Sequence, residues 1–114
     1  MKRVLSLLSF GLLGCASQPR INEFQPGGPT AHQVAVIEAQ VVMPAGAEPV
    51  GHYLRTYFPD GSRIVGQYLL AETPGIRSQI EPDSAIMDGG CGVVTVIFNT
   101  DTSVVESVAC NGVA

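Results

Sequence analysis

The stretch that decides the fold is HYLRTYFPDGSRIVGQYLL, residues 52–70, which has the pattern of two strands joined by a tight turn. β-Branched and aromatic residues alternate with polar ones on both sides of Pro59-Asp60-Gly61, as is typical of strands. Proline presets its own φ, aspartate caps a turn and glycine accepts a positive φ. The sequence therefore predicts a β-hairpin with a three-residue loop.

The length of this loop sets the register of the hairpin, and the register sets the faces. With Phe58 opposite Ser62, the predicted core face carries Leu54, Phe58, Ile64 and Tyr68. The opposite face carries Tyr53, Arg55, Tyr57 and Arg63. Because tyrosine and arginine are enriched in interface hot spots, we predict that these last four residues form a partner-binding surface. The competing interpretation is a solvated face whose tyrosines and arginines contact one another.

A second hairpin is predicted from Val93–Phe98 and Val104–Cys110, around a polar loop at residues 99–103. If its centre lies between Thr100 and Asp101, Cys91 faces Cys110. Directly opposed antiparallel residues have Cα atoms about 4.5 or 5.5 Å apart, within the range that disulfides accept. We therefore expect a structural Cys91–Cys110 disulfide rather than a redox or metal site, because the Cys-x-x-Cys spacing is missing.

The segment between Gln33 and Met43 has apolar residues at every second position and is predicted as a strand. A helix remains the alternative, because Thr30 and Gln33 have the spacing of a capping box. A further short strand is possible at Ile76–Ile80. The expected fold class is all-β: a small, mainly antiparallel sheet of four to five strands, closed as a barrel or folded as a small sandwich.

The amino terminus has the pattern of a signal peptide. Lys2 and Arg3 precede an apolar run from Val4 to Leu13, which as a helix would be about 15 Å long, too short to cross a membrane. The following Leu12-Leu13-Gly14-Cys15 resembles the lipobox of bacterial lipoproteins, although a small residue is commoner at position 13. An ordinary secretory signal is the alternative.

The resemblance covers residues 1–15 only. It implies cleavage before Cys15, two acyl chains on its thiol and usually a third on its amino group; such chains give stable anchoring. Since Ala16 stands where an aspartate would resemble an inner-membrane retention signal, the analogy indicates the outer membrane, facing the periplasm. Residues 16–30 hold three prolines and Gly27-Gly28, so residues 15–30 are predicted to be a flexible tether and residues 31–114 one β domain. Fully extended, this tether reaches about 50 Å.

Charge narrows the class of partner. Removal of residues 1–14 takes away Lys2 and Arg3, leaving four arginines against ten acids, so the net charge falls from −4 to −6. No basic stripe remains for a phosphate backbone, and nucleic acid is not expected as a partner. The lipid, rather than the acidic protein surface, is expected to hold the chain at the membrane.

No catalytic, metal or cofactor motif is present. The two histidines, His32 and His52, lack the spacing of zinc ligands, and no Gly-x-Ser-x-Gly turn occurs. The acids Glu81, Asp83 and Asp88 share one loop but lack the alternating pattern of a calcium loop. We therefore expect a non-enzymatic binding or structural module of the cell envelope, with a protein or an envelope polymer as partner. The alternatives are an inhibitor of a basic hydrolase such as lysozyme and a periplasmic hydrolase using His52.

Overall fold

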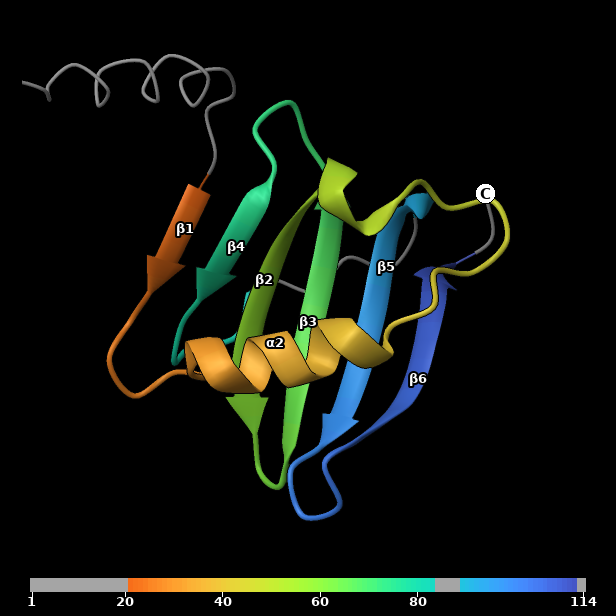
Figure 1. Cartoon of the computed structure of the whole chain (residues 1–114). Coiled ribbons are helices and arrows are strands. Elements are labelled where there is room, and N and C mark those ends of the chain that lie inside the picture. The colour runs from red at the N-terminus through yellow and green to blue at the C-terminus, as the bar shows by residue number, and fades with distance from the viewer. Residues whose placement is uncertain (1–20, 84–88, 113–114) are drawn as a thin grey trace, which may run out of the picture.

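The computed structural model describes residues 21–83 and 89–112 as one six-stranded sheet with a helix across one face (Figure 1). The order of strands across the sheet is β1-β4-β2-β3-β5-β6. In chain order the elements are β1 (Ile21–Phe24), α2 (Ala31–Gln40), the 3-10 turn η1 (Val50–His52), β2 (Tyr53–Asp60), β3 (Arg63–Leu70), β4 (Gly75–Ser78), β5 (Gly90–Asn99) and β6 (Val104–Asn111).

The protein is mostly β, as expected, but the sheet is mixed and larger than predicted. β2, β3, β5 and β6 pair antiparallel, whereas β4 runs parallel to both β1 and β2. One open sheet with α2 on one face takes the place of the predicted barrel or sandwich. The two hairpin turns lie at one end of this sheet, and β1 starts at the other (Figure 1).

The predicted strand between Gln33 and Met43 is wrong, because α2 occupies most of that stretch. Thr30 Oγ1 accepts a hydrogen bond from the Gln33 amide at 3.1 Å, and Gln33 Oε1 accepts one from the Thr30 amide at 2.9 Å. The first amides of a helix have no carbonyl partner within the helix, and this reciprocal capping box supplies a hydrogen-bond acceptor to two backbone amides there. Val34 and Ile37, three residues apart on one helical face, are buried against the sheet.

The hairpin of β2 and β3 forms where predicted but in another register. Asp60 pairs with Arg63, which leaves the two-residue turn Gly61-Ser62, and Gly61 has the positive φ of 61° that a type II′ turn needs at its first central position. Tyr57 therefore faces Gly66 rather than Arg63. The shift from the predicted pairing is three residues, an odd number, so the two faces of β2 are exchanged relative to β3.

The exchange places the β2 tyrosines under the helix. The core face carries Tyr53, Arg55, Tyr57, Ile64 and Tyr68. Leu54 and Phe58, predicted as core, lie half-buried on the opposite face. Gly66 leaves room for this arrangement, because a Cβ there would lie 2.9 Å from the Tyr57 ring.

The predicted disulfide is present at the β5–β6 hairpin, where Cys91 and Cys110 have Cα atoms 4.5 Å apart. The predicted register is wrong, since Cys110 faces Val94. A register shift between Gly90 and Val94 brings Cys91 to Cys110. At the other end of β6, the Gln40 carboxamide donates to Ser103 O and accepts from Val105 N–H, both at 2.9 Å.

The amino-terminal segment is part of the sheet from Ile21 onward. β1 pairs with β4, and the Gln25 amide then donates to Ser78 O at 2.9 Å. The prediction of a flexible tether is therefore wrong for residues 21–30, which belong to the folded domain. No helix in the two described ranges has the length and hydropathy needed to span a membrane.

Candidate functional site

The structure does not bring the four predicted surface residues together on a surface. Tyr53 and Tyr57 are fully buried and Arg55 is 6% exposed, whereas Arg63 lies exposed on the other face of the sheet. The prediction of a partner-binding surface is wrong for the first three residues. The cause is the Gly61-Ser62 turn, which turns their side chains toward α2.

Arg55 and Tyr57 instead form a polar network with Tyr68 and Glu38 that ties α2 to the sheet. The Glu38 carboxylate accepts from Arg55 Nε at 2.9 Å and from the Tyr57 hydroxyl at 2.7 Å, and Tyr57 and Tyr68 share a hydrogen bond of 2.6 Å. Arg55 Nη1 also donates to Val50 O at 2.7 Å. Burial raises the pKa of Tyr57 and of Tyr68 well above the ordinary value, so both hydroxyls stay protonated. A network satisfied in this way holds the fold together.

Arg63 is exposed but its guanidinium is engaged. It donates from Nε and Nη2 to the two carboxylate oxygens of Glu106, at 2.8 and 3.1 Å. Asn99 donates to the same carboxylate at 2.9 Å. These hydrogen bonds hold the pKa of Glu106 below its ordinary value.

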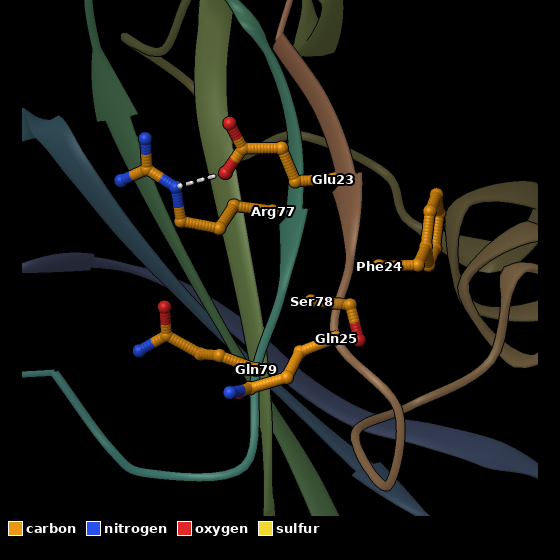
Figure 2. Close-up of a pocket in the computed structure, with 6 residues that line it drawn as sticks. All are labelled: Glu23, Phe24, Gln25, Arg77, Ser78 and Gln79. Atoms are coloured by element: carbon orange, nitrogen blue, oxygen red, sulfur yellow. Dashed lines mark hydrogen bonds and ion pairs between the residues drawn. The ribbon is translucent and has the colours of Figure 1, made fainter.

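A hollow on the sheet beside β1 offers free hydrogen-bonding groups. This β1–β4 hollow has a volume of about 350 Å³ and is open to solvent. In Figure 2 the side chains of Phe24 and Ser78 are turned to one side. The other side carries Glu23, Gln25, Arg77 and Gln79. The lining residues are Glu23, Phe24, Gln25, Arg77, Ser78 and Gln79.

The register of the parallel pair places the polar groups next to one another. Glu23 lies beside Arg77, and their Oε1 and Nε atoms are 3.3 Å apart. Phe24 lies beside Ser78, so Gln25 and Gln79 follow as the next neighbours along the two strands.

The backbone under these side chains is held at several points. Ser78, which is 1% exposed, donates its hydroxyl to Pro29 O. The Gln79 amide donates to Tyr57 O, and the Ile80 amide donates to the Gln25 side-chain oxygen, both at 2.9 Å. The polar groups of the hollow therefore project from a fixed frame.

Part of the hydrogen-bonding capacity of the hollow is unused by residues 21–83 and 89–112. Arg77 makes its bond to Glu23 through Nε, and Gln25 uses its side-chain oxygen on Ile80. Gln79 uses its side-chain nitrogen on Glu81 and Asp83. Within the described part of the chain, Arg77 Nη1 and Nη2, Gln25 Nε2 and Gln79 Oε1 remain available to a ligand.

The other predicted candidates are scattered. His52 and Glu48 are both exposed, and their Nδ1 and Oε1 atoms lie 3.6 Å apart. His32 is exposed on α2. Within the described ranges, no three residues of the types that bind metals lie close enough to hold an ion. Cys15 and Asp88 lie outside the described residues. Sequence reasoning missed the β1–β4 hollow because it assigned residues 21–25 to the tether.

No protein-family model, curated protein or solved structure matches this chain.

Proposed function

We propose that the protein is a bacterial envelope lipoprotein, anchored through Cys15, whose β domain is a non-enzymatic binding module working close to the membrane. The observation that carries the proposal is Leu12-Leu13-Gly14-Cys15 behind a cationic start and an apolar run. An acylated cysteine at that position would hold the domain at a membrane, and Ala16 in place of an aspartate favours the outer membrane, facing the periplasm.

The disulfide supports export from the cytoplasm. Disulfides persist in oxidising compartments such as the periplasm and are rare in the cytosol. Of the three cysteines in the chain, Cys91 and Cys110 are bonded to each other, which leaves Cys15 as the remaining thiol. The cysteine at the lipobox position is thus the one available for acylation.

The position of β1 makes the proposed anchor short. Ile21, the first residue of β1, follows Cys15 by six positions, and six residues span at most about 20 Å when extended. The end of the sheet at which β1 starts would therefore stay within about 20 Å of the lipid. The β1–β4 hollow begins two residues later, at Glu23, and would meet its partner near the membrane.

Mass spectrometry of the membrane fraction tests the anchor. The peptide that begins at Cys15 is expected to carry acyl chains, and Cys15→Ala is expected to abolish acylation and release the chain from the membrane. Ser17→Ala, which changes a neighbouring position and keeps the lipobox, should remain acylated. An unmodified Cys15 thiol in the mature protein would overturn the proposal.

A further inference from the structure

We propose that the β1–β4 hollow binds the terminal or side-chain carboxylate of an extended peptide. In this arrangement Arg77 takes the carboxylate, while Gln25 and Gln79 take the neighbouring peptide group. The inference rests on the proposed binding role, and it names the ligand class and the residues that select it.

Arg77 is the described arginine with the most free donors. Arg55 is buried and donates to Glu38, Val50 O and Tyr53 O, and Arg63 is held by both oxygens of Glu106. Arg77 makes a single bond of 3.3 Å through Nε. Both terminal nitrogens of Arg77 therefore remain available, and this pair matches the two oxygens of a carboxylate.

Glu23 orients the Arg77 guanidinium and leaves its binding edge free. The bond from Nε to Glu23 occupies the side of the planar group, and Figure 2 shows the two terminal nitrogens pointing away from that carboxylate. The Glu23 side chain is 65% exposed, so water screens its charge and weakens its competition with a bound carboxylate.

The two glutamines supply the groups that a peptide unit needs. A peptide unit has one N–H donor and one C=O acceptor. Gln25 offers a free Nε2 donor and Gln79 a free Oε1 acceptor, because their other amide atoms are bonded to Ile80, Glu81 and Asp83. A carboxylate with an adjacent peptide group therefore matches the unused groups of Arg77, Gln25 and Gln79.

The net charge of the chain bears on how strongly the hollow is expected to bind a carboxylate. A net charge of −6 in the proposed mature form repels anions at long range, so recognition must come from directed hydrogen bonds rather than from steering. In an open hollow we expect weak binding of a small probe, with a dissociation constant of about 1 mM.

The test uses the full mature chain, labelled with ¹⁵N in detergent micelles, and N-acetylalanine as the probe. This probe carries a carboxylate beside one amide group, whereas N-acetylalaninamide lacks the charge. N-Acetylalanine is expected to give saturable shifts of the Arg77 Nε–H and of the Gln25 and Gln79 side-chain amides. N-Acetylalaninamide is expected to bind at least tenfold more weakly, which corresponds to a loss of about 1.4 kcal/mol in binding free energy.

Two matched variants separate the site from general charge effects. Arg77→Gln is expected to lower affinity for N-acetylalanine at least tenfold, and Arg63→Gln, which makes the same charge change elsewhere on the sheet, is expected to leave it unchanged. Arg77→Lys keeps the charge but loses the paired donors, so it is expected to bind more weakly than the parent. It also serves if Arg77→Gln fails to fold.

The proposal is overturned if the neutral amide binds equally well, if Arg63→Gln loses as much affinity as Arg77→Gln, or if N-acetylalanine causes no saturable shift. It is also overturned if N-acetylglucosamine alone shifts these groups, which would make the ligand a glycan. Acylation of Cys15 is measured separately, so failure of the carboxylate site is distinguishable from failure of the anchor.

Discussion

The two outer strand pairs of the sheet are built in opposite ways. β5 and β6 are joined by a short turn, run antiparallel and are linked by the Cys91–Cys110 disulfide. β1 and β4 come together from positions 54 residues apart, run parallel over four residue pairs and share one exposed ion pair. Closing a long loop costs more chain entropy than closing a short one.

The difference shows where rigidity and function are placed in this fold. The β5–β6 pair has a covalent link, and Glu106 on β6 also accepts hydrogen bonds from Asn99 on β5 and from Arg63 on β3. The β1–β4 pair has the weaker connection but keeps the free donors and acceptors described above. We expect β1 to separate from the sheet before β6 when the protein is destabilised, because less holds it there.

Breaking the disulfide should have the largest effect. The double variant Cys91→Ala/Cys110→Ala is expected to lower the free energy of unfolding by about 3 kcal/mol, the value for a loop of roughly twenty residues. Urea denaturation measures this change, and the parent protein under reducing conditions is the control. A loss well under 1 kcal/mol would mean that the β5–β6 pair does not depend on its covalent link.

Placing a side chain at Gly75, where β1 and β4 approach each other closely, should have a smaller effect. Gly75 has a φ of 146°, and a Cβ there would lie 2.0 Å from Ile21 O, so Gly75→Ala is incompatible with the observed pairing. We expect a loss of about 2 kcal/mol, limited by what β1 contributes, together with fast hydrogen exchange at residues 21–24.

Gly51→Ala is the matched control for this change, because nothing lies within 4 Å of a Cβ at that position. Its stability and its β1 exchange rates should match those of the parent. Protected β1 amides in Gly75→Ala would show that the two strands tolerate a side chain between them.

The smallest expected effect is on acid stability. Because the pKa of Glu106 is lowered in the folded chain, its pairing with Arg63 stabilises the fold fully at pH values above 4.5, the ordinary pKa of glutamate. This contribution is lost as the pH falls through the lowered value. Carboxyl titration by NMR should show the Glu106 pKa rising in Arg63→Gln and staying unchanged in Arg77→Gln. An equal rise in both variants would contradict the assignment to Arg63.

Local signals in the sequence predicted the position of both hairpins and the disulfide. The turn residues around Asp60 and Asp101 mark the two reversals of the chain. The second reversal brings Cys91 and Cys110 onto neighbouring strands, which is why the disulfide could be predicted. The registers were harder to predict. Pro59-Asp60-Gly61 fits a three-residue loop, yet Gly61 sits at the first position of a two-residue turn. That difference exchanged the faces of β2 and placed Tyr53, Arg55 and Tyr57, three of the four predicted surface residues, in the core.

The helix and β1 were missed for different reasons. The segment from Gln33 has apolar residues at both helical and strand spacing, and the capping box at Thr30 was the signal that favoured the helix. β1 has four residues and pairs with a strand far along the chain, so nothing local marks it. Because the candidate site depends on this non-local pairing, the sequence pattern did not predict it.

Gln40 has a consequence for how molecules of this protein meet. An edge strand exposes backbone groups that another chain can pair with, and β6 is such an edge. The Gln40 carboxamide bonds Ser103 O and Val105 N–H, two backbone groups that the N–H and C=O of a residue in an added strand would otherwise bond. One side chain of the helix thereby occupies the first pairing position of this edge. The proposed lipid anchor would crowd many copies on one membrane, and this occupied position would then make strand-to-strand aggregation harder to start.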